Sequence, residues 1–152
     1  MQDFIVYHGL QGRRPRGFTF QGLHAHPEGI HVGSLAQARM RAGGGTILKL
    51  RLRASAITRI PRVRDQDGYW KNLLRRRARQ GDRILTYLNR YEGIPTDRVI
   101  ETLGRDLDCA RMPDATFRKL VPEAQDSWIV LDPALIEILG SVRKPRVRST
   151  AI

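Results

Sequence analysis

The stretch from Phe4 to Gly9, Phe-Ile-Val-Tyr-His-Gly, brings an unbroken apolar run directly to a histidine and a glycine. Four consecutive apolar or aromatic residues, two of them β-branched, predict a short strand with both faces covered. His8 then lies at the strand end, where a rigid scaffold often presents side chains to ligands. Gly9 lacks a Cβ and lets backbone or a ligand come close. We therefore predict that His8 either binds a ligand or is a structural histidine whose hydrogen bonds are made within the protein.

The size and charge of the chain limit its class and its partners. A length of 152 residues predicts one domain with a substantial core. Lys and Arg number 27 against 15 Asp and Glu, which gives a net charge of +12. Such a charge attracts anions, so we expect a nucleotide, a nucleic acid or an acidic protein as partner. An arginine-rich coding bias explains the same composition, and the oligomeric state is left open.

The single cysteine, Cys109, excludes an internal disulfide, and four histidines are too few to suggest a metal centre. His24 and His26 form a His-x-His pair without an evident third ligand, so we expect no metal. The sequence contains neither a long apolar run nor a secretory signal. These features predict a cytoplasmic protein without membrane contact.

The next stretch predicts a strand followed by a helix. Gly29 to Gly33 is a β-type pentapeptide, and Ser34 with Gln37 three residues later forms a capping box. The helix should end at residues 43–45, which are three glycines. Its N-terminal amides could accept an anion. Residues 46–53 then alternate leucines with cations, which predicts a half-buried strand with a cationic outer face.

A second strand end carries the leading candidate for a catalytic group. Residues 55–64 read as extended, 69–80 as a helix with Trp70, Leu73, Leu74 and Ala78 inward, and 83–88 as a strand. The strand runs into Asn89-Arg90-Tyr91-Glu92-Gly93, and Glu92 is the only acidic residue between Asp82 and Asp97. Glu92 is therefore either a catalytic carboxylate or a solvated loop glutamate.

The C-terminal third alternates between variable and ordered segments. Residues 95–121 appear helical, with anchors at Leu103, Leu107, Phe117 and Leu120. A buried strand is expected at 126–131. Asp132 and Pro133 then predict a short helix that buries Leu135, Ile136 and Leu139. Residues 141–152 are basic without apolar periodicity, which predicts a flexible tail after a single domain at 1–140.

These motifs, taken in order, resemble the ADP-ribosyltransferase-like domains found in phage, polyvalent and toxin proteins. The resemblance rests on Tyr-His-Gly at residues 7–9, Gly-Ile-His-Val-Gly-Ser-Leu-Ala-Gln-Ala-Arg at 29–39 and the alternating strand at 47–52. It continues with Asp65 and Trp70, Tyr-Leu-Asn-Arg-Tyr-Glu-Gly at 87–93 and Ser-Trp-Ile-Val-Leu-Asp-Pro at 127–133. It implies an α+β protein with a split β-sheet, flanked by short helices.

The resemblance also implies an activity, namely transfer of ADP-ribose from NAD to an acceptor with release of nicotinamide. In it His8 would bind the adenosine ribose, Gly9 would contact nicotinamide through its backbone, and Glu92 would hold the nicotinamide-ribose hydroxyl. His31 stands where a tyrosine is commoner. The implied NAD-binding set is Tyr7, His8, Gly9, Gly29, His31, Ser34 and Asn89, with Glu92 and His8 catalytic. Arginines of the 13–16 loop or Arg51 would meet the pyrophosphate.

The chemistry agrees with a single carboxylate. Cleavage of the glycosidic bond to nicotinamide develops positive charge on the ribose, which a nearby carboxylate stabilises most in the transition state. Nicotinamide leaves neutral, so no acid is required. Two other readings stay open, namely a basic nucleic-acid-binding or metal-independent nuclease-like protein and a catalytically inactive NAD-binding interaction module. The acceptor is either a macromolecule or water, and the sequence does not distinguish between them.

Overall fold

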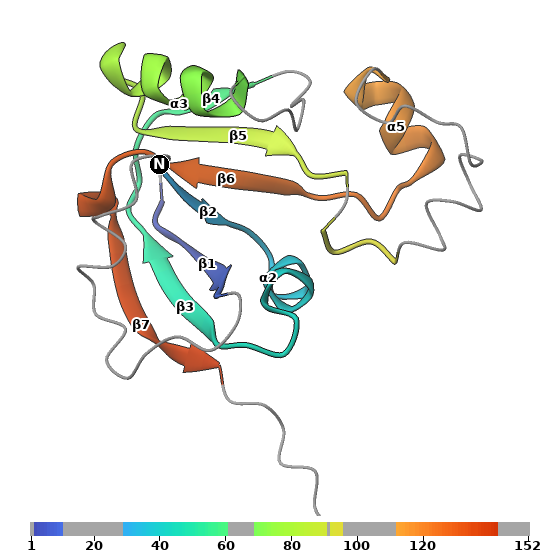
Figure 1. Ribbon diagram of the computed structural model, residues 1–152, viewed down its shortest axis with the longest axis horizontal. Coiled ribbons are helices and arrows are strands. Elements are labelled where there is room, and N and C mark those ends of the chain that lie inside the picture. Colours follow the sequence, from blue (N-terminus) through green and yellow to red (C-terminus); the bar gives the residue numbers. More distant parts are fainter. Residues whose placement is uncertain (1, 11–28, 61–68, 91, 96–111, 143–152) are drawn as a thin grey trace, which may run out of the picture.

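A computed structural model describes residues 2–10, 29–60, 69–90, 92–95 and 112–142. Within them the chain is a mixed α+β protein built on two β-sheets (Figure 1). The elements in order are β1 (Phe4–Gly9), β2 (Ile30–Val32), α2 (Leu35–Ala42), β3 (Ile47–Leu52), β4 (Ile57–Arg59), α3 (Tyr69–Arg79), β5 (Ile84–Leu88), α5 (Asp114–Leu120), β6 (Asp126–Val130), the 3₁₀ turn η1 (Pro133–Leu135) and β7 (Ile136–Val142).

The first sheet has three antiparallel strands in the order β1-β3-β7. Its centre is β3, where the predicted alternation is confirmed. Leu48, Leu50 and Leu52 are buried, whereas Lys49 and Arg51 point to solvent. The apolar face of this strand therefore fixes which side of the sheet becomes core.

The second sheet has four strands in the order β2-β6-β5-β4. The strands β2, β6 and β5 are antiparallel, and the short edge strand β4 runs parallel to β5. Alternate residues of the two central strands face opposite sides. Ile84 and Val130 pack against the first sheet, whereas Leu85 and Ile129 pack beneath α3. The sheet is thus covered on both faces.

One backbone bridge joins the two sheets. Tyr7 of β1 donates its N–H to the carbonyl of Gly33 at 2.8 Å and accepts the N–H of Gly33 at 3.0 Å. Beyond this pair the strands β1 and β2 separate, because Gly33 leads at once into the cap of α2. The sheets consequently meet at one point and diverge from it, and that point positions the site described below.

The predicted capping of α2 is confirmed on both ends. The Ser34 hydroxyl accepts the N–H of Gln37, and the Gln37 side chain accepts the N–H of Ser34. Gly43 ends the helix in a left-handed conformation with φ of 54°. Gly9 explains how α2 comes so close to β1, because a Cβ at Gly9 would collide with the carbonyl oxygen of Ala38. Gly9 is thus used for close packing of backbone.

The prediction of a helix after Asp132 is wrong. Asp132 does cap a helical turn, accepting the N–H of Ala134 at 3.0 Å, but that turn is the three-residue η1. Ile136 then enters β7, which pairs with β3 and runs to Val142. Ile136 and Ile138 face inward while Leu139 is 38% exposed, as strand alternation requires. Backbone pairing with the edge of β3 that β1 leaves free therefore stabilises a strand here more than the local sequence stabilises a helix.

Three burial predictions also fail. Ile5 is 42% exposed, because the outer face of the first sheet is open at this position, so β1 is not covered on both faces. Ala78 lies on the exposed side of α3, while Leu73 and Leu74 are buried as predicted. In α5 only Phe117 is fully buried, and Leu120 is 38% exposed.

Several sequence predictions fall outside the described residues. These are the basic loop at 13–16, His24, His26, the turn at 65–68, Tyr91, the anchors Leu103 and Leu107, and the tail from residue 143. Among the helices that the structure describes, none has the length and apolar character needed to cross a membrane.

The close approach of α2 to β1 gives a test of the packing. Gly9→Ala should lower the free energy of unfolding by about 3 kcal/mol, because the new methyl group meets rigid backbone. Gly43→Ala is the control, since its Cβ meets nothing within 4 Å and only the left-handed backbone is strained, at about 1 kcal/mol. Denaturant unfolding measures both. Equal losses would show that the Gly9 contact relaxes without cost.

The anchor of η1 predicts a pH dependence. Hydrogen bonds from Arg83, at 2.6 and 2.9 Å, hold the pKa of the Asp132 carboxyl below its ordinary value. A depressed pKa stabilises the fold above the unfolded-state pKa and loses that effect as pH falls through the folded-state value. Asp132→Asn, which keeps a capping oxygen, should cost less than about 1 kcal/mol at pH 7 because the pair is exposed. The difference from wild type should begin to shrink near about pH 3.9, the unfolded-state pKa of aspartate, and should vanish only below the lower folded-state pKa, as measured by denaturant titrations at several pH values.

Candidate functional site

A cleft opens where the two sheets diverge. Its empty space of about 230 Å³ includes open solvent, so the cleft is a shallow hollow and not an enclosed cavity. Its walls come from β1, β2, α2, β5, the segment after β5 and β6. The lining residues are Tyr7, Gly9, His31, Val32, Gly33, Gln37, Ala38, Arg41, Tyr87, Glu92 and Ser127. Four segments that are distant in sequence therefore meet at this cleft.

Glu92 is held at the cleft by an asparagine turn. The Asn89 side chain accepts the backbone N–H of Glu92 at 2.8 Å and donates to Glu92 Oε1 at 3.1 Å. Asn89 itself is 4% exposed, whereas the Glu92 side chain is 27% exposed. The carboxylate is thus anchored at one oxygen and reaches solvent at the cleft. Oε2 has no partner among the described residues.

The asparagine is in turn part of a buried polar chain that reaches α2. Asn89 donates to Ser127 Oγ at 3.0 Å, and Ser127 donates to Gln37 Oε1 at 3.0 Å. Gln37 Nε2 donates to the carbonyl of Gln125 at 3.2 Å. All three side chains are nearly inaccessible. Within the described residues, no buried side-chain nitrogen or oxygen lacks a hydrogen-bond partner.

Gln37 occupies the space that two glycines leave open. A Cβ at Gly33 would collide with Gln37 Oε1, and a Cβ at Gly93 would come within 2.8 Å of Gln37 Cγ. Gly93 also has φ of 82°, which disfavours other residues. The side chain that caps α2 is therefore wedged between the first turn of the helix and the segment that carries Glu92.

His8, near the C-terminal end of β1, contacts the neighbouring strand β2. Its Nδ1 lies 2.6 Å from the carbonyl oxygen of His31. A carbonyl only accepts, so in the neutral ring Nδ1 carries the proton and Nε2 is an acceptor. The contact fixes both the tautomer and the ring orientation of His8, and it ties the end of β1 to β2.

Arg41 is the cation of the cleft. It projects from the last turn of α2, with Nη1 3.9 Å from Glu92 Oε1 and a side chain that is 33% exposed. The spacing is that of a loose, partly exposed ion pair. Arg51, predicted to meet a pyrophosphate, instead pairs with Glu137 at 3.1 Å on the outer face of the first sheet.

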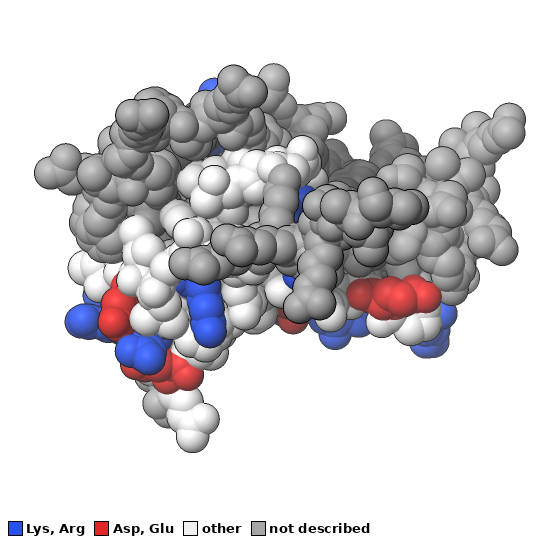
Figure 2. Space-filling view, turned by 90° about the horizontal axis from the view of Figure 1, so that it is seen from below, with Lys and Arg blue, Asp and Glu red and all other residues white. Residues whose placement is uncertain are grey.

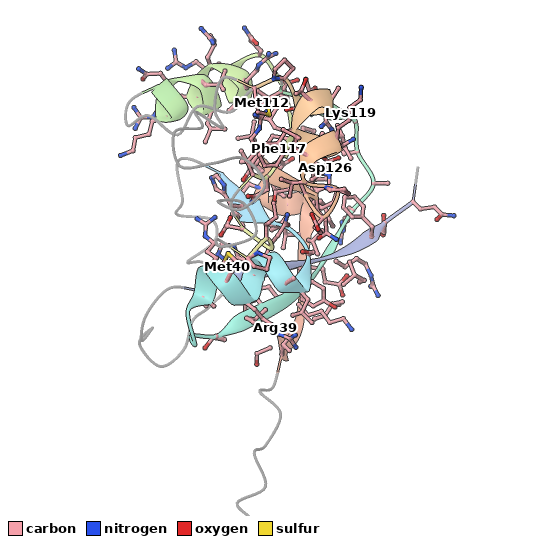
Figure 3. The ribbon with its side chains drawn as sticks, turned by 90° about the vertical axis from the view of Figure 1, so that its right-hand side faces the viewer. Arg39, Met40, Met112, Phe117, Lys119 and Asp126 are labelled. Carbon is pink, nitrogen blue, oxygen red and sulfur yellow. The ribbon has the colours of Figure 1, made fainter. Side chains whose placement is uncertain are left out.

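The segment carrying Glu92 is also fixed from α5. Arg90 is 5% exposed, donates to Asp114 Oδ1 at 2.7 Å and lies 5.0 Å from the ring centroid of Phe117. Phe117 and Asp126 are labelled in Figure 3. Hydrogen bonding to Asp126 raises the pKa of Arg59, which also pairs with Asp114. This charge network holds α5 against β5, beside Asn89.

Not all predicted site residues meet in the cleft. Tyr7, Gly9, His31 and Glu92 line it, and Asn89 lies directly behind Glu92. His8 borders it through His31. Ser34 uses its hydroxyl for the helix cap, and the Cβ of a residue at position 29 would meet Ile129, so both belong to the scaffold.

Seven of the lining residues were not predicted as site residues, and those among them that connect to Glu92 through side-chain contacts are Gln37, Arg41 and Ser127. Gln37 was read only as a capping residue, and neither Arg41 nor Ser127 was proposed for the site. The capping box could have indicated Gln37, because it predicts that this side chain folds back onto the first turn of the helix. Nothing local distinguishes Arg41 from its neighbour Arg39, which is exposed.

Among the described residues, no three His, Cys, Asp or Glu side chains are grouped so that they could hold a metal ion. Comparisons with protein-family models, with curated proteins and with solved structures each returned no significant match. The site has therefore to be interpreted from its own geometry.

The polar chain behind Glu92 predicts a stability effect. Gln37→Ala should cost about 3 kcal/mol, because Ser34 N–H, Ser127 Oγ and the Gln125 carbonyl all lose a partner. Gln80→Ala, at an exposed position after α3, should change stability by less than about 0.5 kcal/mol. Denaturant unfolding of both variants decides this. A similar small change at Gln37 would contradict a stabilising role for the chain.

Proposed function

We propose that the cleft binds the nicotinamide-ribose half of NAD and transfers ADP-ribose, with Glu92 as the catalytic carboxylate. The observation that carries the proposal is the meeting of Glu92 with Tyr7, Gly9 and His31 at one cleft. Those residues come from the same motifs, in the same order, that resemble ADP-ribosyltransferase-like domains. A split β-sheet of that type is part of the proposal.

The carboxylate has the environment that the reaction requires. Glu92 Oε1 is occupied by Asn89, which leaves Oε2 to accept a ribose hydroxyl. A carboxylate at that hydroxyl stabilises the positive charge that develops on the ribose as the bond to nicotinamide breaks. Arg41 lies 3.9 Å from Glu92 Oε1 and provides a fork suited to a phosphate oxygen.

The aromatic and polar walls suit the remaining parts of the nucleotide. Tyr7 lines the cleft, is half-buried and offers ring surface to nicotinamide. Tyr87 also borders the cleft, but its ring belongs to the buried core beneath α3. We assign His8 to the adenosine ribose on the resemblance of Tyr-His-Gly to the family motif, and its Nδ1–H donates to the His31 carbonyl, which fixes the orientation of the ring. The cleft is too small for the whole dinucleotide. The adenosine half accordingly extends beyond its described walls.

Removal of the carboxylate tests the assignment. Glu92→Gln should lower kcat for nicotinamide release by at least about a hundredfold, since the amide cannot stabilise a developing cation. Its Kd for NAD should stay within about tenfold of wild type, since one hydrogen bond contributes little to binding. Release of labelled nicotinamide from NAD, with and without cell lysate as a source of acceptor, gives kcat, and calorimetry gives Kd.

Glu137→Gln is the matched control, because Glu137 is an exposed glutamate of β7 whose partner is Arg51. It should leave both quantities unchanged. NAD binding without any nicotinamide release by the wild type would assign the chain to the inactive-module reading. Absence of NAD binding would overturn the proposal altogether.

A further inference from the structure

The outer face of α3 is the most one-sided charged surface among the described residues. The helix contains five cations, Lys71, Arg75, Arg76, Arg77 and Arg79, and no acidic residue. Its inner side is firmly docked, because Leu73 and Leu74 are buried with Leu85 and Ile129 of the second sheet. The cations therefore stand on a fixed helix, which lies apart from α2 in both Figure 1 and Figure 3.

Helical geometry places these cations together. At about 100° per residue, Arg75, Arg76 and Arg79 lie within an arc of roughly 100°, opposite the two leucines. Arg75 and Arg79 are separated by one turn, about 6 Å along the axis. Each of the three is exposed. The side chains of α3 extend away from the sheet with nitrogen at their ends (Figure 3).

The three arginines have no acidic partner in the described parts of the chain. Asp82 is the nearest acid in sequence, but it accepts from Thr58 at 3.1 Å and pairs with Arg77 at 3.6 Å. Arg77 lies on the inner side of the helix and is only partly exposed. Like charges one turn apart destabilise a helix. The fold gains nothing from this arrangement that the described contacts reveal.

Outside α3, most of the described arginines pair with an acid, and Arg39 and Arg53 are the exceptions. On the first sheet Arg51 pairs with Glu137, and around α5 Arg59, Arg90 and Arg118 pair with Asp114 or Asp126. Figure 2 shows basic and acidic side chains interspersed on the face that it presents. The uncompensated face of α3 differs from these surfaces, which is what a binding surface for a polyanion requires.

We propose that this face of α3, formed by Arg75, Arg76 and Arg79, binds the phosphate backbone of a nucleic acid. Guanidinium groups match phosphate oxygens with two parallel hydrogen bonds, and a row of them follows a repeating charge. The exposed positions of residues 71–79 carry no large apolar side chain, so the face lacks the means to insert into a lipid surface. An acidic protein would need apolar contacts that this face does not offer.

The test compares two triple variants of the full chain that lose the same charge. Arg75→Gln/Arg76→Gln/Arg79→Gln changes α3, and Lys49→Gln/Arg51→Gln/Arg53→Gln changes the outer face of β3. Fluorescence anisotropy with labelled single-stranded RNA and with a DNA duplex gives Kd at salt concentrations from about 50 to 200 mM. Circular dichroism and denaturant unfolding establish that both variants are folded, since glutamine is a good helix former.

The α3 variant should bind at least about tenfold more weakly at low salt. For three phosphate contacts, the slope of log K against log salt should fall in magnitude by about 2 with the single-stranded RNA and by about 3 with the DNA duplex. The β3 variant should keep the wild-type slope. Equal weakening by both variants would overturn the proposal, because only the overall charge would then matter. Equal competition by a polyglutamate peptide of the same charge would also overturn it.

This proposal does not depend on NAD chemistry. The α3 variant should release nicotinamide as the wild type does, and Glu92→Gln should bind the oligonucleotides as the wild type does. Failure at one surface is therefore distinguishable from failure at the other.

Discussion

The side chain of Gln37 is the constraint on which the described site depends. Its carboxamide oxygen accepts from Ser34 N–H and from Ser127, and its amide donates to the Gln125 carbonyl. One group thus closes the N-terminus of α2 and fixes β6 to it. A buried carboxamide is costly unless all its hydrogen bonds are made, so the surrounding backbone has to adopt one arrangement. At Gly33 and Gly93 the backbone comes so close to the Gln37 side chain that a Cβ would collide with it.

The same constraint explains why Glu92 has a defined position although it follows a strand end. From α2 the chain of contacts runs through Ser127 and Asn89 to the carboxylate. From the opposite side Arg90 is fixed by Asp114 and Phe117 of α5. A residue held between two packed helices loses little freedom when a ligand arrives, which is the pre-organisation that a catalytic carboxylate needs.

Local patterns predicted the elements that local physics decides. The strand at 4–9, the capping box of Ser34 and Gln37, and the alternation of β3 all appear as expected, because each depends on neighbouring residues alone. The strand β7 was missed because Asp132-Pro133 is a true helix start and Leu135, Ile136 and Leu139 also fit helical spacing. Only the unpaired edge of β3 decides between the two structures, and that edge is not visible in a local window.

The site was predictable to the extent that its residues sit at strand ends. Glu92 was found that way and Tyr7 through the resemblance of Tyr-His-Gly, whereas Arg41 enters the cleft because of where α2 packs, which Gly9 determines. The arginines show the same limit of prediction. In the composition they count as a single excess of positive charge, whereas in the fold they have three different roles. Arg51 and Arg59 stabilise sheets, Arg41 faces a carboxylate, and the outer arginines of α3 have no acidic partner among the described residues. Net charge therefore gives no indication of which surface binds an anion, since the pairing of each cation is decided by tertiary contacts.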